Sequence, residues 1–182
     1  MAWLLRVGGL LAAVLLVAAA GLWAMGTRAD AGRLETAVVI HAPPDRVWPW
    51  LIDPEKLKRW VDWLVDVNLD IGAPQGVGAI SVWQMRDEDN AGQLIQVQNT
   101  CVEYTPPRHL VVELLAPGSF VGQRSYTLTP LGSGSSRLEI EAQYRYIPWF
   151  ARLIEPLVTP LAQKKLTGDG MRLKGLVESG AS

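Results

Sequence analysis

An uncharged segment near the N-terminus, Val7–Gly26, constrains this chain more than any other feature of its sequence. At a helical rise of 1.5 Å per residue the segment spans roughly 30 Å, the thickness of the hydrocarbon core of a bilayer. Trp3 and Trp23 lie near its two ends, where indole side chains favour the headgroup region. The segment therefore predicts an N-terminal membrane anchor, residues 1–26, that crosses the bilayer through residues 7–26.

A cleaved secretory signal is the main alternative to the anchor. Arg6 and the free amine would form its positive n-region, and the small residues Ala18–Gly21 would supply a cleavage site. The apolar core of a signal usually has about 7–15 residues, and the longer segment here favours the anchor. A buried helix of a soluble core is disfavoured, because such helices seldom lack a polar face.

Charge determines the side of the membrane only weakly. Arg6 precedes the span, and Arg28 and Arg33 follow it, so the positive-inside rule gives no clear orientation. Short N-terminal tails usually stay inside. We therefore expect a single-pass protein of the cell membrane whose soluble part is extracytoplasmic.

The rest of the chain has the size of one domain. The full sequence has 182 residues, and about 150 remain after the span. Its 17 basic and 18 acidic residues give a net charge of −1 and form no basic stripe, which argues against a nucleic-acid partner. Residues 27–33 read as a polar linker with a reach of at most about 25 Å, which leaves 34–180 as the domain.

Turn-forming residues divide this domain into short elements. A strand is predicted over 33–41, a short helix over 45–51, and a second short helix from the N-cap Asp53 to about Val61. Further strands are predicted over 64–71, 77–86, 93–104, 109–115, 121–129 and 136–147. Because strands joined by short turns pair antiparallel, we expect one curved antiparallel sheet of about seven strands.

The last third of the chain changes to a helical period. Pro156 and Pro160 predict a bend near the start of this helix. The helix is the only element long enough to cover the sheet, and one cylinder cannot fill a concave surface, so we expect a cavity between them. Its apolar residues are Phe150, Leu153, Ile154, Leu157 and Leu161, then Leu173, Leu176 and Val177.

Several motifs occur in a specific order. The segment Ile40–Trp48 (IHAPPDRVW) is followed by Leu51, Ile52, Asp53 and Trp60, then by the glycine pair Gly76 and Gly78, Pro107-Arg108, Glu155-Pro156-Leu157 and the ending Leu173–Glu178. Together these motifs resemble the SRPBCC superfamily, and within it the branch labelled polyketide cyclase/dehydrase and lipid transport. The resemblance covers about residues 34–178.

This resemblance implies an α+β, START-like (helix-grip) fold, with the curved sheet around the long C-terminal helix and one transmembrane helix before it. Members of the superfamily bind ubiquinone, sterols, phospholipids or aromatic polyketides, and some catalyse cyclisation. One departure is Thr167-Gly168-Asp169-Gly170, where the family usually has a charged, continuous helix. It leaves the straightness of the closing helix open.

Strand parity suggests where a ligand would bind. Alternation places Leu138, Ile140, Ala142, Tyr144 and Tyr146 on one inward face, and Phe120, Arg124, Tyr126 and Leu128 on the inward face of the preceding strand. An inward arginine is costly unless paired, and would suit a ligand carboxylate or carbonyl beside tyrosine hydroxyls. Otherwise Arg124 reaches solvent or pairs with a nearby glutamate.

Two tryptophans are added to these candidates, because Trp48 and Trp60 lie on the short helices that form one mouth of a helix-grip cavity. Core packing is the simpler interpretation for both, and for Trp63. His41, His109 and Cys101 lack neighbours at metal-ligand spacing, so neither a metal nor another cofactor is expected.

Membrane-tethered binding of a hydrophobic small molecule or lipid is the favoured function. A cyclase or dehydrase would need an acid/base pair, for which Arg124, Tyr126, Tyr144 and Glu103 are the available groups. No nucleophile–base pair is visible, so no catalytic residue is assigned. A non-binding interaction domain with a filled core is the third possibility.

Overall fold

The computed structural model describes residues 2–28, 31–69, 75–87, 92–132 and 134–180, without the side chains of residues 2–5 and 87. The predicted strand end at 70–71 and most of the loop after residue 87 lie outside these ranges. The helices are α1 (Ala2–Gly26), α2 (Pro44–Val47), α3 (Pro49–Ile52), α4 (Pro54–Trp60) and α5 (Ala151–Glu178). The strands are β1 (Arg33–Ile40), β2 (Leu64–Leu69), β3 (Ile80–Asp87), β4 (Gln93–Thr105), β5 (His109–Ala116), β6 (Phe120–Pro130) and β7 (Ser136–Tyr146).

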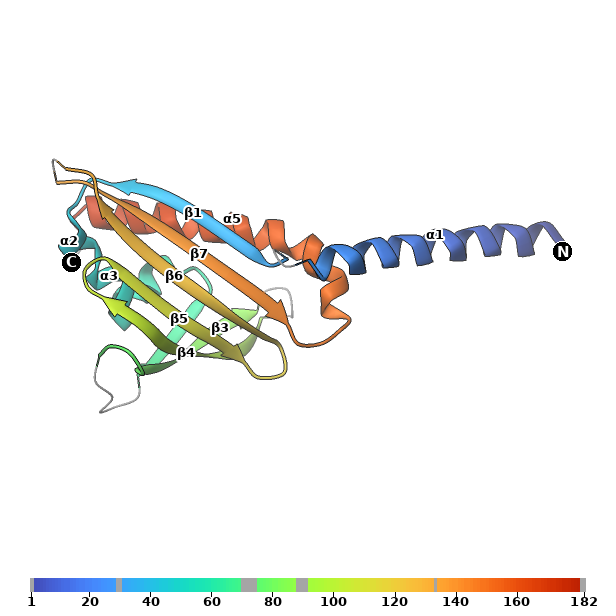
Figure 1. Cartoon of the computed structure of the whole chain (residues 1–182), viewed down its shortest axis with the longest axis horizontal. Coiled ribbons are helices and arrows are strands. Elements are labelled where there is room, and N and C mark those ends of the chain that lie inside the picture. The colour runs from blue at the N-terminus through green and yellow to red at the C-terminus, as the bar shows by residue number, and fades with distance from the viewer. Residues whose placement is uncertain (1, 29–30, 70–74, 88–91, 133, 181–182) are drawn as a thin grey trace.

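The strands form one antiparallel sheet in the order β1-β7-β6-β5-β4-β3-β2. Short connections join strands 2 to 7, so neighbours in sequence are neighbours in the sheet. β1 lies at one edge and pairs with β7, which places the first and last strands side by side (Figure 1). The expected curved sheet with a long closing helix, the α+β helix-grip fold, is therefore confirmed.

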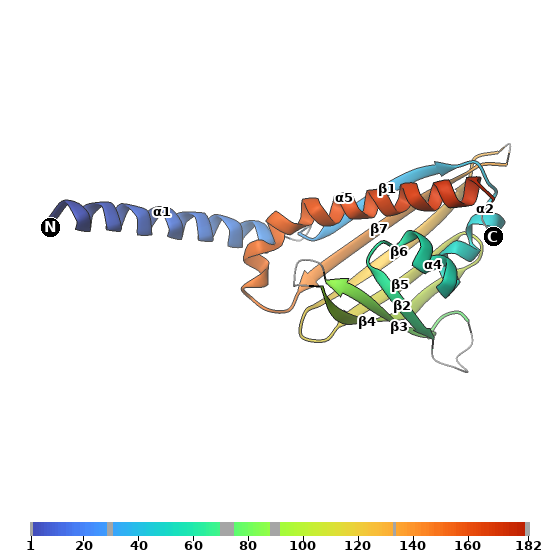
Figure 2. The same cartoon turned by 180° about the vertical axis from the view of Figure 1, so that it is seen from behind.

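Alternation along β7 separates the two faces of the sheet. Leu138, Ile140 and Ala142 are buried, whereas Arg137 and Glu141 are exposed. The inward residues join those of the other strands, of α5 and of the short helices in one continuous core. Seen from behind, α5 and the short helices lie over the inner face of the sheet (Figure 2).

The short helices between β1 and β2 begin at prolines. The helix expected over 45–51 is two helices, because Pro49 has no N–H to continue α2 and instead begins α3. Asp53 caps α4 as expected, since its carboxylate accepts hydrogen bonds from the backbone N–H groups of Glu55 and Lys56.

The closing helix α5 is continuous through Gly168-Asp169-Gly170, so the departure from the family pattern does not interrupt it. Gly170 is buried against β1, where a Cβ atom would lie 3.5 Å from Val38 and 3.6 Å from Thr36. The first turns of α5, which contain Pro156 and Pro160, run at an angle to the rest of the helix (Figure 2).

The two halves of α5 bury different kinds of residue. Near the C-terminus Leu173 and Val177 pack into the core, as the apolar pattern suggests. In the first half Ile154, Leu157 and Leu161 are exposed, as is the N-cap residue Phe150, and the buried positions are Ala151 and Glu155. The apolar stripe that starts the helix therefore does not face the sheet.

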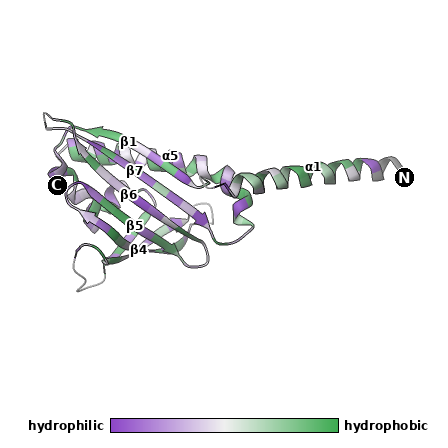
Figure 3. Ribbon diagram, viewed as in Figure 1, coloured by the Kyte–Doolittle hydropathy of each residue, from purple (hydrophilic) through white to green (hydrophobic). Residues whose placement is uncertain are grey.

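The N-terminal helix α1 extends away from the domain and is apolar along almost all of its length (Figure 3). Nearly every described side chain in it is exposed. By length and composition Arg6–Gly26 could cross a membrane or serve as a signal sequence. Its C-terminal end contacts the first turns of α5, and β1 begins at Arg33, the last residue of the predicted linker.

Candidate ligand site

Arg124 is the central polar residue of the inner face. It lies on β6, its side chain points between the sheet and the helices, and it is only 6% exposed. Its guanidinium donates to the hydroxyl of Tyr144 at 2.5 Å and to that of Tyr126 at 3.4 Å. The cation also lies over the ring of Trp83, 5.7 Å from its centroid. Three aromatic side chains therefore surround the buried charge.

No carboxylate among the described residues forms an ion pair with Arg124, and its Nε has no hydrogen-bond partner. Burial works against the charge, but the phenol groups of Tyr144 and Tyr126 favour it, and the pKa of Arg124 is raised on balance. An arginine side chain stays protonated in proteins, so the site contains a permanent cation. A buried cation that has no anionic partner is unusual in proteins.

A small internal hollow lies directly beside this cation. Its free volume is about 10 Å³, roughly the room that one water molecule needs. Besides Arg124, its lining residues include the buried Asn99, whose Oδ1 has no hydrogen-bond partner either. The hollow is lined by Trp63, Trp83, Met85, Val97, Asn99, Leu114, Phe120, Arg124 and Tyr144. The surface that faces the hollow is apolar, so the two unsatisfied polar atoms lie behind an apolar and aromatic lining.

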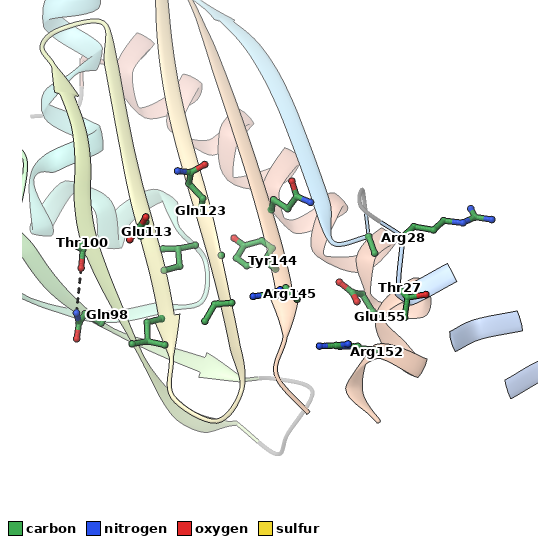
Figure 4. A pocket seen from close by; sticks show the side chains of 17 residues that line it. Thr27, Arg28, Gln98, Thr100, Glu113, Gln123, Tyr144, Arg145, Arg152 and Glu155 are labelled. Carbon is green, nitrogen blue, oxygen red and sulfur yellow. Dashed lines mark hydrogen bonds between the residues drawn. The ribbon is translucent and has the colours of Figure 1, made fainter. Parts of the chain in front are cut away.

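A much larger hollow, about 930 Å³, lies mainly on the outer face of the sheet (Figure 4). Outward residues such as Gln98, Glu113 and Gln123 line it, and its far end is formed by Arg28, Arg152 and other residues where α1 meets α5. It is an open groove whose lining mixes polar and apolar residues. The enclosed hollow at Arg124 is the better candidate for a hydrophobic ligand, because a ligand there is removed from water.

The structure brings three of the predicted site residues together and places Tyr146, Trp48 and Trp60 apart from them. Arg124, Tyr126 and Tyr144 are in mutual contact through the two hydrogen bonds of the guanidinium. Tyr146 instead packs edge-on against Phe120, with 6.4 Å between ring centroids. It belongs to the end of β7 and does not line the small hollow.

The two predicted tryptophans are buried away from that hollow. Trp60 donates through Nε1 to the carbonyl of Trp50 at 2.8 Å, which fits a packing role. Trp48 packs against Tyr104 at 5.7 Å between centroids, and its own Nε1 has no partner. Neither tryptophan lines the hollow at Arg124.

Sequence reasoning missed Asn99 and Trp83. In β4 the residues Val97, Asn99 and Cys101 alternate inward, so the parity that selected Arg124 also selects Asn99 as a polar residue at an inward position. Trp83 lies directly opposite Val97 on β3. Its contact with Arg124 depends on the curvature of the sheet, for which the sequence has no local signal.

Asp169 on α5 is a second buried charge near the site. It accepts hydrogen bonds from the backbone N–H of Asp62 at 3.2 Å, from Trp63 Nε1 at 3.4 Å and from Arg172 Nη1 at 2.9 Å. Burial nevertheless raises the pKa of this carboxyl group. Asp169 thus joins α5 to the β2 side of the sheet, and its three donors leave it occupied.

Both histidines lie next to a single carboxylate. His41 Nδ1 is 2.9 Å from Glu178, and His109 Nε2 is 3.3 Å from Glu103, which is exposed at the surface. The described part of the chain contains no cluster of three His, Cys, Asp or Glu side chains placed to hold a metal ion. Cys101 is buried, and burial raises the pKa of its thiol.

A curved antiparallel sheet that grips one long helix defines the helix-grip class of folds. The sequence model of the family described as "Polyketide cyclase / dehydrase and lipid transport" matches residues 31–178, and the chain belongs to this family. It is therefore a domain of the SRPBCC type, as the motifs indicated.

Solved structures with the same fold include a START superfamily protein from Mycobacterium smegmatis, with a TM-score of 0.65 at 15% identity over 82% of this chain and 99% of that one. The Zhui aromatase/cyclase from Streptomyces sp. R1128 has a TM-score of 0.65 at 16% identity, covering 82% and 95%. A protein from Thermus thermophilus has a TM-score of 0.64 at 23% identity, covering 82% and 99%. No curated protein sequence matches significantly.

Proposed function

We propose that this protein is tethered to the membrane and binds a hydrophobic small molecule or lipid whose carbonyl or carboxylate oxygen is held by Arg124. The observation that most supports this is the buried guanidinium that contacts two phenols and an indole without an anionic partner. A ligand oxygen at the free Nε would supply the missing acceptor. Tyr126 and Tyr144 contribute hydroxyl groups beside it.

The surrounding residues suit an apolar ligand. Trp83, Phe120 and Met85 line the hollow with aromatic and apolar surface. Covering about 300 Å² of apolar ligand surface would contribute about 7 kcal/mol before the costs of binding, so affinity requires no covalent step. Because the hollow has a free volume of only about 10 Å³, such a ligand must displace side chains as it enters.

The support for tethering is α1, which is long and apolar enough to cross a membrane. We assign residues 1–26 to the anchor, 27–33 to the linker and 34–180 to the ligand-binding domain, with that domain outside the cytoplasm. Protease treatment of intact spheroplasts tests the side of the membrane. Degradation of the domain is the expected result, and full protection until lysis would place it inside.

Native mass spectrometry of the detergent-solubilised full chain tests ligand binding. We expect a co-purifying hydrophobic molecule in the wild type and its loss in Arg124→Met. Arg137→Met is the matched control, because Arg137 lies on β7 with its side chain on the exposed outer face. Equal occupancy in both variants, or a wild type that stays empty, would contradict the proposal.

A cyclase or dehydrase activity is the alternative that the family and the fold of the aromatase/cyclase suggest. The available acid/base groups do not favour it: Glu103 lies at the surface, and Asp169 is occupied by three donors. The same spectra distinguish the alternatives. Recovery of a chemically unchanged ligand supports binding, whereas turnover of an added aromatic polyketide mimic would support the enzyme.

A further inference from the structure

Six large apolar side chains are exposed together where β7 leads into α5. Their exposed fractions run from 47% to 66%, although the residues come from an ordered helix and the segment before it. We call this group the α5 apolar patch; it consists of Ile147, Trp149, Phe150, Ile154, Leu157 and Leu161. A contiguous group of this kind usually marks a surface that is covered in the working protein.

Exposed residues of the patch recur at helical spacing, so these residues lie together on one side of the helix. Phe150, Ile154, Leu157 and Leu161 follow one another at intervals of four, three and four residues, which keeps them within one stripe of a helix. The opposite side of these turns buries Ala151 and Glu155. The first turns of α5 are thus amphipathic, but their apolar stripe faces away from the domain and not toward it.

The patch lies beside the end of α1. Gly26 approaches the backbone of Arg152 so closely that a Cβ atom would overlap its carbonyl oxygen. The rings of Trp23 and Trp149 are 6.5 Å apart, and Trp149 also packs against Phe150 at 6.1 Å. Both views of the molecule show the start of α5 next to the C-terminal end of α1 (Figures 1 and 2).

This contact sets the depth of the patch. Trp23 lies three residues before the end of α1, which is about 4.5 Å along a helix axis. If α1 crosses a bilayer, Trp23 is at the level of the headgroups, and Trp149 is at the same level because the two indoles are in contact. Arg28 and Arg152 line the larger groove together with Gly26 at the end of α1, where their charges can reach lipid phosphates.

We propose that the α5 apolar patch is a second membrane contact, which lies in the interface of the bilayer that α1 crosses and fixes the domain against the lipid surface. This inference rests on the anchor of the proposed function. The occupant is the bilayer itself, since the patch is continuous with the apolar helix through Trp23 and Trp149. An interfacial helix with an apolar stripe, a flanking Trp and nearby arginines is the usual form of such a contact.

Spin labels on the full-length chain in phosphatidylglycerol/phosphatidylcholine vesicles test this contact. Cys101 is the single cysteine, so Cys101→Ser gives a background for Leu157→Cys and Ile154→Cys, both at exposed positions where labels leave the core intact. We expect oxygen to broaden the spectra of these labels more than a water-soluble nickel complex does. Leu131→Cys, exposed in the turn between β6 and β7, should show the reverse.

Val14→Cys in α1 separates failure of the contact from failure of the anchor. A lipid-exposed label at Val14 with water-exposed labels at Leu157 and Ile154 would overturn the second contact and leave the anchor intact. Water exposure at Val14, or a mature chain without that residue, would overturn both. Spin–spin broadening at Leu157 between copies, lost on dilution with unlabelled protein, would overturn the proposal in favour of a second chain as the cover.

Discussion

Tyr144 lies directly opposite Gly122 in the ladder between β6 and β7, and its ring occupies the space beside the missing side chain. A Cβ atom at position 122 would lie 3.1 Å from Cδ1 of Tyr144 and 2.5 Å from the carbonyl oxygen of Gln143. The glycine thus leaves room for the phenol that receives a hydrogen bond from Arg124.

Replacing this glycine should disturb both the sheet and the site. We expect Gly122→Ala to lower the free energy of unfolding by about 1–3 kcal/mol, because the backbone of β7 has to move away. Gly168→Ala is the control, since nothing lies within 4 Å of that position in α5 and it should gain up to about 1 kcal/mol. Urea unfolding in detergent, followed by tryptophan fluorescence, measures both; equal stability of the two variants would contradict the role of Gly122.

Arg124 should contribute to binding and not to stability. We expect Arg124→Met to be as stable as the wild type or up to about 2 kcal/mol more stable, because an apolar side chain replaces a buried charge. The same unfolding measurement tests this, with Arg137→Met again as control. A loss of more than about 3 kcal/mol would instead identify Arg124 as a structural residue.

The two phenols should contribute unequally to ligand binding. Tyr144 accepts a hydrogen bond from Arg124 at 2.5 Å and Tyr126 accepts one at 3.4 Å. Tyr144→Phe should therefore weaken the orientation of the guanidinium more than Tyr126→Phe does. We expect ligand occupancy to fall about tenfold for Tyr144→Phe and less for Tyr126→Phe. Native mass spectrometry gives the ranking, and Tyr146→Phe, outside the hydrogen-bonded group, should keep the ligand.

The contribution of Asp169 to the stability of the fold should decrease as the pH rises. Burial raises the pKa of this carboxyl group, so the folded chain binds its proton more tightly than the unfolded chain does. The resulting stability is present below the unfolded pKa of about 3.9 and is lost as the pH rises through the higher folded pKa. The melting temperature of the wild type relative to Asp169→Asn should therefore fall as the pH rises from acid to neutral.

Glu178 lies on the same helix, and the pKa of its carboxyl group is shifted in the opposite direction. The backbone N–H of His41, the His41 side chain and Lys174 hold its pKa below the usual value. Its contribution is present above the unfolded pKa of about 4.3 and is lost as the pH falls through the lower folded pKa. The wild type relative to Glu178→Gln should therefore gain stability with rising pH, and parallel curves for the two variants would contradict both assignments.

The strands and the inward position of Arg124 were predictable because they depend on local alternation. Period-2 patterning in β6 and β7 places Arg124, Tyr126 and Tyr144 on one face, and the register confirms that these strands are neighbours. The bend of α5 likewise follows from its prolines.

The features that the sequence could not predict depend on contacts between residues far apart in the chain. Helical spacing identified Phe150 and Leu157 as one stripe, but spacing does not say whether a stripe faces a sheet or a lipid surface. The segment around Asp169 left the straightness of the helix open, and the hydrogen bonds from Asp62 and Trp63 could not be predicted because these donors are more than a hundred residues away. The small volume of the hollow depends on how all these side chains fill the curved sheet.

That nearly filled hollow has a consequence for affinity and rate. A ligand larger than one water molecule can bind only to conformations in which the aromatic side chains around Arg124 have moved apart. For the proposed ligand, the apparent dissociation constant would then be the intrinsic one divided by the population of those open conformations, and capture would be slower than diffusion. A bilayer that favours the open conformations would act as an allosteric effector of the pocket, by changing a population without touching the ligand.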